Sequence, residues 1–360
     1  MTPIVLLGDI SLVRNGKSNS QDSVTDGKYP FFDRSQIIKK SNQYLFDTDG
    51  IIIPGEGKEF TPRFFSGKFD LHQRAYVIQG DQNKVDDKYL YYAILSGKDY
   101  LSRTAVGSTV KSLRKPQIER MPIPLPMLNT QAKIADILGS IDEKIELNRK
   151  MNDTLEQMGQ VLFRFQFINN PEARKWEIKR VSEIIDFVGG SQPPKTEHVY
   201  EKRDGYIRFI QNRDYSSNNH KTYIPNSSRN KICNETDIMM DKYGEAGKVR
   251  FGIAGAYNVA LSKIIPKLPN TQEYLRAYFS LPNTQRILES AAAASTRSSL
   301  NSTTFAGLEI HLPPSELLSR FENAQKTAIY KQMLCRDEIQ TLTTLRDTLL
   351  PRLISGKLKV

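Results

Sequence analysis

The sequence predicts an α+β protein made of two α/β domains, one in each half of the chain. Each domain is followed by a long helix, and the two helices are expected to form an antiparallel coiled coil. An internal repeat, two segments with the apolar spacing of paired helices, and a length of 360 residues lead to this prediction. The predicted boundaries are 1–125 for the first domain, 126–170 for the central helix, 171–313 for the second domain and 314–360 for the distal helix.

An internal repeat relates the two halves of the chain at a constant shift of 187 positions. Residues 107–126 align with residues 294–313 without a gap. The identical pairs are Ser108 and Ser295, Thr109 and Thr296, Ser112 and Ser299, Leu113 and Leu300, Ile123 and Ile310, Leu125 and Leu312, and Pro126 and Pro313. Both copies then run into a long helical pattern, so the plan of the chain is domain, helix, domain, helix.

Looser matches extend the repeat toward the start of each domain. They pair residues 7–10 with 181–184, residues 55–58 with 244–248, and residues 67–70 with 255–258. Short strands and helices are predicted between clusters of Gly, Asn, Asp and Pro. The strands are expected at 51–53, 76–78, 206–210 and 259–261, and the helices at 87–97 and 271–291.

The two long helices are predicted from the spacing of their apolar residues. The first is expected from a cap at Asn129 to about Phe167, and the second from about Ser315 to Pro351. Apolar residues at alternating three- and four-residue steps are typical of a coiled-coil seam, although simple bundle packing gives similar stripes. Helix–helix and docking contacts are expected at Leu138, Ile141, Ile145, Leu155, Leu162, Ile339, Leu342, Leu345 and Leu349.

Basic residues outnumber acidic ones, and the excess lies in the two predicted domains and the distal helix. The formal net charge is +11, with +4 on residues 1–125, −1 on 126–170, +5 on 171–313 and +3 on 314–360. Two separated basic blocks are what a protein that binds a polyanion at two places needs. A pI near 9 is also common among cytosolic proteins, so charge alone does not decide between these readings.

Composition and termini predict a cytoplasmic protein. No segment approaches the ~18 to 20 consecutive apolar residues of a membrane helix. The N-terminal residues lack the basic region of a signal peptide. Two cysteines, Cys233 and Cys335, cannot supply a disulfide framework.

The sequence contains no motif that predicts catalysis, a metal site or a bound cofactor. Residues 14–18 resemble the end of a phosphate-binding loop, but Ser11 stands where its first glycine is needed. The chain has no Gly-x-Gly-x-x-Gly, no Gly-x-Ser-x-Gly and no Asn-Pro-Pro-aromatic tetrapeptide. The four histidines lack partners at metal-ligand spacing, and they are His72, His198, His220 and His311.

Polar and basic residues in and near the repeated segments are candidates for contact with nucleic acid, because hydroxyls and cations bind phosphates while Arg and Asn read base edges. In the first domain these are Lys58, Arg63, Arg74, Ser108, Thr109, Lys111 and Arg114. In the second they are Arg208, Arg213, Lys242, Tyr243, Lys248, Ser295, Thr296, Arg297 and Asn301. The repeated Ser-Thr-x-x-Ser-Leu segment can also cap a helix, with Leu113 and Leu300 in the core. Packing residues should repeat between copies, and reading residues should differ.

Residues 125–155 and 342–358 resemble the central and distal helical regions of the specificity subunits of Type I restriction–modification systems. The first match runs from Leu125-Pro126 through Gln131-Ala132-Lys133-Ile134-Ala135-Asp136-Ile137-Leu138. The second runs from Leu342 through Leu349-Leu350-Pro351-Arg352-Leu353 to Ser355-Gly356-Lys357-Leu358. The resemblance covers essentially the whole chain and is weaker in the flanking domains, which look like the family's two target recognition domains.

The resemblance implies that each domain reads one half of a split, asymmetric site on double-stranded DNA, and that the helices fix the unread gap. It also implies two methyltransferase subunits, an endonuclease–translocase subunit, and no membrane. S-adenosylmethionine, ATP and magnesium would then be bound by those partners, and none by this chain.

Two other classes of protein fit parts of the sequence. A coiled-coil scaffold with non-specific nucleic-acid binding predicts little sequence preference and no methyltransferase partner. A single-chain nuclease predicts equivalent acidic clusters in both repeats, but Asp70 aligns with Asn258 and Glu119 with Ala306.

Overall fold

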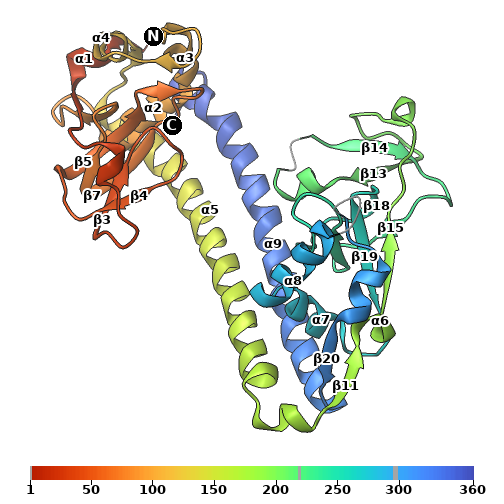
Figure 1. Ribbon diagram of the computed structural model, residues 1–360. Coiled ribbons are helices and arrows are strands. Elements are labelled where there is room, and N and C mark those ends of the chain that lie inside the picture. Colours follow the sequence, from red (N-terminus) through yellow and green to blue (C-terminus); the bar gives the residue numbers. More distant parts are fainter. Residues whose placement is uncertain (1, 218–219, 295–298) are drawn as a thin grey trace. The chain divides into compact units, whose positions relative to one another are not determined.

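Residues 2–217, 220–294 and 299–360 are described by the computed structural model, and they fall into two units (Figure 1). The first unit is residues 1–148 together with 338–360, and the second is residues 149–337. Each unit therefore contains one α/β domain and a part of each long helix.

A six-stranded sheet forms the centre of the first unit (Figure 1). Its strands, in their order across the sheet, are β2 (Ser11–Asn15), β8 (Ala75–Gly80), β5 (Phe46–Pro54), β7 (Arg63–Leu71), β3 (Tyr29–Phe32) and β4 (Lys39–Ser41). Neighbours are antiparallel except β3 and β7, which are parallel. The predicted strands 51–53 and 76–78 lie within β5 and β8. Ile51, Ile52 and Ile53 are buried, because β5 is covered on both faces.

Smaller elements surround this sheet. They are the paired strands β1 (Ile4–Leu6) with β10 (Pro122–Pro124) and β6 (Glu56–Gly57) with β9 (Lys111–Ser112), the helices α1 (Leu7–Ile10), α2 (Asp87–Ser96), α3 (Lys98–Thr104) and α4 (Lys115–Glu119), and the 3₁₀ helix η1 (Ser20–Asp22). Helix α2 confirms the prediction for 87–97. Asp86 begins it by accepting a 2.8 Å hydrogen bond from the Tyr89 amide.

Two four-stranded sheets form the centre of the second unit. Across the first, the strands are β12 (Ile185–Gly189), β19 (Leu261–Pro266), β16 (Ile238–Asp241) and β17 (Val249–Arg250). Across the second, they are β14 (Thr222–Pro225), β13 (Tyr206–Ile210), β18 (Gly255–Tyr257) and β15 (Ile232–Cys233). Together they keep the strand order of the first unit, with β16 and β15 in the place of β5 and with β17 and β18 in the place of β7. Gly252 lies in the break between β17 and β18 and has a φ of +94°.

The second unit also has smaller elements and two corrections to the predictions. The elements are β11 (Glu177–Arg180) paired with β20 (Glu309–Leu312), helices α6 (Val181–Ile184), α7 (Gln272–Phe279) and α8 (Pro282–Ala293), and 3₁₀ helices η3 (Pro171–Lys175), η4 (Lys195–Glu197), η5 (Asn212–Tyr215) and η6 (Ser302–Gly307). Strand β13 confirms 206–210. The strand predicted at 259–261 is wrong, since Val259 and Ala260 form a turn before β19. The helix predicted at 271–291 is two helices, because the chain is extended at Leu281 before Pro282.

Matching hydrogen bonds show that the repeat is structural. The Tyr89 hydroxyl donates to the carbonyl of Pro124, and the Tyr274 hydroxyl donates to the carbonyl of His311, both at 2.6 Å. The sequence register was wrong by two residues in two places. The amides of Leu113 and Leu300 donate to the carbonyls of Gly55 and Lys242, respectively, so Gly55 is equivalent to Lys242 and not to Gly244. The amides of His72 and Asn258 donate to the last residues of β3 and β13, respectively, so Asn258 is equivalent to His72 and not to Asp70.

The long helices are α5 (Leu128–Phe163), which continues as the π-helix η2 (Arg164–Ile168), and α9 (Ser315–Ile354). In the first unit, α5 and α9 meet where Asn148 donates to Glu338 at 2.8 Å. In the second unit, the rings of Phe163 and Phe321 lie 5.8 Å apart. Contact partners run in opposite directions along the two helices, so the pairing is antiparallel, as predicted.

The predicted ends of the helices need correction. Helix α5 begins at Leu128, so Asn129 lies in its first turn and does not cap it. Helix α9 passes through Pro351 to Ile354, so the proline does not end the helix. The chain then turns at Gly356, whose φ is +73° and whose amide donates to the Leu353 carbonyl.

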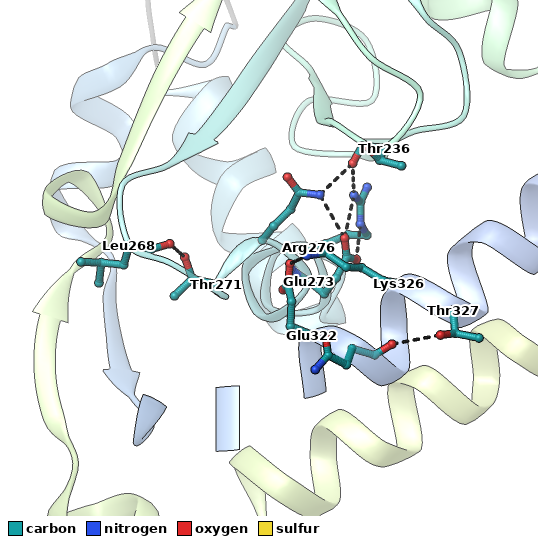
Figure 2. Close-up of polar contacts among 10 residues, drawn as sticks. Thr236, Leu268, Thr271, Glu273, Arg276, Glu322, Lys326 and Thr327 are labelled. Atoms are coloured by element: carbon teal, nitrogen blue, oxygen red, sulfur yellow. Dashed lines mark hydrogen bonds and ion pairs between the residues drawn. The ribbon is translucent and has the colours of Figure 1, made fainter. Parts of the chain in front are cut away.

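A residue of α9 caps the start of α7 in the second unit. Thr271 precedes α7, but its hydroxyl donates to the Leu268 carbonyl at 2.7 Å and leaves the helix amides unpaired. The Glu322 carboxylate accepts from the Glu273 amide at 2.9 Å instead, and both side chains are buried (Figure 2). Arg276 pairs with Glu273 at 2.7 Å beside them. The second domain is therefore joined to its long helix by buried polar contacts.

Candidate nucleic-acid interface

Two predicted contact loops of the first domain lie together. Strands β6 and β9 pair Gly57 with Lys111, and the Leu113 amide donates to the Gly55 carbonyl at 2.8 Å. This pairing places Lys58 in the same region as the loop that contains Ser108 and Thr109, and all three side chains are exposed. The Lys111 ammonium donates to the carbonyl of Ser102 at 3.0 Å and stays exposed. The loops form one polar surface with two lysines.

The second domain has an equivalent junction. The Leu300 amide donates to the Lys242 carbonyl at 3.3 Å, as Leu113 does to Gly55. Leu113 and Leu300 are both buried, so the repeated leucine is a packing residue. Lys242 and Tyr243 lie here, with the ammonium 5.7 Å from the ring centroid.

The remaining candidates in this part of the second domain are Ser295, Thr296, Arg297 and Asn301. Ser295, Thr296 and Arg297 lie outside the described residues. The Asn301 carboxamide oxygen accepts from the Thr304 amide at 3.1 Å, so its side chain caps η6. The sequence left a capping role open for the repeated Ser-Thr-x-x-Ser-Leu segment, which ends at Leu300, one residue before Asn301.

Several candidate cations form ion pairs within their own domain. Arg74 and Arg34 bind opposite oxygens of Glu56 at 2.7 and 2.8 Å. Burial alone would raise the pKa of Glu56, but the hydrogen bonds from the two arginines outweigh it and hold that pKa below its ordinary value. Lys248 pairs with Glu245 at 2.6 Å. Arg74 is exposed and Lys248 is partly buried.

Arg63 and Arg250 occupy equivalent positions and are held in place. Arg63 pairs with Ile52 across β5 and β7, and Arg250 pairs with Met239 across the equivalent strands β16 and β17. The Arg63 guanidinium donates to the Gln36 carboxamide oxygen at 2.7 Å, and that of Arg250 donates to the buried Asp241 carboxylate at 2.8 Å. By the criterion that packing residues repeat, both arginines belong to the framework.

Arg208 and Arg213 meet the same carboxylate but differ in exposure. Arg208 lies 3.1 Å from the Asp214 carboxylate, and both groups are inside the domain. Arg213 lies 3.9 Å from it and is 60% exposed. The head of Arg213 is therefore free to reach a partner, whereas Arg208 balances a buried charge.

A run of lysines and tyrosines near one edge of the first sheet escaped the sequence analysis. Lys28 lies 5.6 Å from the Tyr29 ring, the rings of Tyr29 and Tyr44 are 5.0 Å apart, and Lys68 lies 4.7 Å from Tyr44. The two rings meet edge to face at an interplanar angle of 61°, and the hydroxyl and ammonium groups beside them suit a sugar–phosphate backbone. These residues are scattered along the sequence, and only the pairing of β3 with β7 brings them together.

The predicted seam of the long helices is mostly as expected. Leu138, Ile141 and Ile145 are buried. The partly buried members are Leu155, Leu162, Ile339, Leu342 and Leu349. Leu345 is 44% exposed, so it does not belong to the seam, and its expected role in docking stays a prediction. Arg346 takes the seam position in its place and pairs with Asp142 at 2.8 Å.

A serine–histidine contact in the first domain has the wrong geometry for catalysis. The Ser20 hydroxyl lies 3.3 Å from Nε2 of His72, while Nδ1 of His72 accepts from the Arg74 amide at 3.0 Å. The proton of the neutral ring is then on Nε2, which donates to Ser20 and cannot activate it as a base. Burial lowers the pKa of His72, so the ring is neutral at pH 7.

The described residues contain neither a cluster of metal-ligating side chains nor a helix that could span a membrane. Within 2–217, 220–294 and 299–360, His, Cys, Asp and Glu side chains form no group of three or more that could hold a metal ion. Over the same residues, no helix combines the length and the apolar character needed to cross a bilayer.

Known proteins are similar to this chain in sequence and in fold. The family described as "Type I restriction modification DNA specificity domain" matches residues 4–157 and 173–332. The chain is 27% identical over 307 residues to the Type I restriction enzyme MjaIX specificity subunit of Methanocaldococcus jannaschii, covering 77% of this chain and 70% of the relative. It is 22% identical over 392 residues to the HindI specificity subunit of Haemophilus influenzae, covering 85% of each chain.

A solved structure agrees with the fold. The crystal structure of the Type I restriction–modification S subunit from M. genitalium superposes with a TM-score of 0.73. The superposition covers 98% of this chain and 96% of that chain at 16% identity. The architecture and the two family matches define a subunit that gives a restriction system its DNA specificity. The chain belongs to the Type I restriction–modification specificity family, and it is a specificity subunit, which is not catalytic.

Proposed function

We propose that each α/β domain reads one half of a split, asymmetric site in the major groove of double-stranded DNA. The observation that carries this proposal is the pair of equivalent frameworks with different surfaces. Three features repeat between the two domains. They are the strand order, the hydrogen bond of Tyr89 or Tyr274, and the buried Leu113 or Leu300. Ser108 and Thr109 also repeat as Ser295 and Thr296, but the basic candidates beside them do not, since Lys111 aligns with Ser298 and Arg114 with Asn301. Two copies of one framework with different surfaces read two different half-sites.

Outward-facing polar side chains would make the contacts. In the first domain Lys58 and Lys111 would bind phosphates, with Ser108 and Thr109 between them. In the second domain Arg213 and Lys242 would do so. Arg63 and Arg208 would act indirectly, by holding the loops that carry the contact residues.

The paired helices would set the length of the unread gap. Helix α5 begins in the first unit and ends in the second, without a break from Leu128 to Phe163. A continuous helix is stiff, and its length grows by about 1.5 Å per residue. Its number of residues would therefore fix the number of base pairs between the half-sites.

The outer faces of the helices would dock the other subunits. In the second unit, four apolar side chains along α5 and its continuation η2 are exposed at spacings of seven, three and four residues, and they are Met151, Met158 and Val161 of α5 and Phe165 of η2. An exposed apolar stripe at helical spacing is typical of a surface that another protein covers. Two methyltransferase subunits are the proposed occupants, with an endonuclease–translocase subunit joining for restriction. S-adenosylmethionine, ATP and magnesium would be bound by those partners.

A domain exchange tests independent reading. Residues 1–125 are replaced by the first domain of another specificity subunit, and the methylated motif is mapped in cells that also make the methyltransferase subunit. The expected result is a change in one half-site, with the other half-site and the gap unchanged. A change in both half-sites would contradict independent reading.

A further inference from the structure

The loop between β3 and β4 is fixed by its own polar side chains. The Asp33 carboxylate accepts from the Ser35 amide and from the Ser35 hydroxyl, both at 2.7 Å. Its other oxygen pairs with the Lys39 ammonium at 2.7 Å. This arrangement closes the turn at both ends, since Asp33 precedes it and Lys39 follows it. The loop is therefore ordered before any partner arrives.

Neighbouring strands brace the same loop from inside the domain. The Arg63 guanidinium of β7 donates to the Ser35 carbonyl at 3.1 Å and to the Gln36 carboxamide at 2.7 Å. Arg34 of the loop pairs with Glu56 at 2.8 Å. Every polar side chain between Asp33 and Lys39 thus has a partner in its own domain.

The two apolar residues of the loop are exposed to solvent. Ile37 is 73% exposed and Ile38 is 54% exposed. One exposed isoleucine is ordinary on a protein surface, but two adjacent ones on a braced loop present a fixed apolar tip. Residues 28–40 carry four basic residues and one acidic residue, so this tip stands in a positive field that suits DNA.

The second domain repeats the brace but not the tip. Arg250, the equivalent of Arg63, lies 5.9 Å from the ring of Tyr215, in the loop that follows β13. Strand β13 is the equivalent of β3, so both arginines support the same loop. Residues 211–216 read Gln-Asn-Arg-Asp-Tyr-Ser, whereas residues 33–38 read Asp-Arg-Ser-Gln-Ile-Ile. The supporting arginine repeats between the two domains, whereas the residues of the loop differ. This is the pattern expected of residues that distinguish two half-sites.

We propose that Ile37 and Ile38 determine specificity in the first half-site by contacting thymine methyl groups in the major groove. This inference rests on the proposed function and adds the chemical group that is read. The 5-methyl group of thymine is the apolar feature on that groove's base edges, and aliphatic side chains recognise it by direct contact. Arg63 and Asp33 act as positioning residues that hold the tip at the groove.

Replacement of thymine by uracil tests the contact, because uracil differs only by the missing methyl group. The complex of the full chain with its methyltransferase subunit is bound to a duplex that carries its mapped motif. Each thymine of the first half-site is then replaced in turn. The chain with Ile37 and Ile38 should bind roughly three- to fivefold more weakly at one or two positions, as expected for a lost methyl contact. The double variant Ile37→Ala, Ile38→Ala should bind both duplexes equally.

Leu12→Ala is the matched control, because Leu12 is 54% exposed on β2, at the other edge of the same sheet. It should keep the full response to uracil. The proposal is overturned if uracil has no effect at any position, if the first half-site contains only G·C pairs, or if the double variant keeps the response. It is also overturned if the double variant fails to bind the methyltransferase subunit, since the tip would then be a protein contact. Absence of any motif in the first mapping would instead refute the proposed function.

Discussion

Glu322 is a residue whose effect reaches beyond its own helix. It supplies the cap of α7 that Thr271 does not, and its carboxylate also lies 3.2 Å from the Lys326 ammonium. A helix amide left unpaired inside a protein costs as much as a lost hydrogen bond. The fixed position of α7 on α9 therefore depends on this side chain (Figure 2).

Glu322→Ala should loosen α7. The expected loss is about 1 to 2 kcal/mol in the free energy of local opening, the usual cost of a lost helix cap. Hydrogen exchange at the Glu273 amide measures it directly. Glu316→Ala is the control, because Glu316 pairs with Arg320 on the surface of the same helix and such pairs contribute little. Equal protection of the Glu273 amide in both variants would contradict the capping role.

Residue roles could be predicted only where the sequence repeats. Leu113 and Leu300 were expected in the core from their constant spacing, and both are buried. Leu345 was assigned to the seam from its apolar character, but Arg346 with its partner Asp142 occupies that position. The partner of Arg346 is distant in sequence, as is the amide that Glu322 caps. Pattern alone does not give such pairs.

Helices and strands could be predicted from the sequence where the spacing of apolar residues repeats within a short segment. The long helices and β13 were predicted, because their spacing repeats within a few residues. Val259 and Ala260 were predicted to lie in a strand, but they form a turn. Apolar content alone does not distinguish a strand from a turn. The interruption of the strand at Gly252 also had no clear signal, since a glycine within a strand can mark a bulge or a break.

The lengths of α5 and α9 should set the unread gap. A second copy of residues 149–155 is inserted between Asn148 and Arg149, and a second copy of 331–337 between Asp337 and Glu338. Because Asn148 pairs with Glu338, the two insertions lie at one level, and seven residues preserve the seam. Each helix grows by about 10 Å.

The methylated motif should then gain about three base pairs in its gap, at roughly 3.4 Å for each pair, with both half-sites unchanged. Modified-base mapping in cells reads this out. Insertion into α5 alone is the control, and it should abolish methylation because the seam loses its register. A motif with the original gap from the doubly extended chain would refute the spacing role.

The exposed stripe on α5 and η2 should carry partner binding. Val161→Glu with Phe165→Glu places two charges where an apolar partner surface is expected, and it should weaken binding of the methyltransferase subunit at least about tenfold. Co-purification measures this. Gln160→Glu adds charge to a neighbouring exposed position and should have little effect. Undiminished binding by the double variant would place the docking surface elsewhere.

The whole molecule follows a duplicated plan. Each unit builds the same strand order and closes it with the same tyrosine–carbonyl bond, and each joins a part of α5 and α9. The plan could be predicted, because duplication leaves a constant shift in the sequence. The contact surface could be predicted only in part, since residues that differ between the copies leave no such trace. The tyrosine and lysine run of β3 and β7 is one example.

The most direct test of the central claim is to map methylated bases in cells that make the methyltransferase subunit with and without this chain. The account predicts methylation at one split motif when both are present, and its loss when this chain is omitted. The same motif without the chain, or an assembled complex that methylates no split motif, would contradict it.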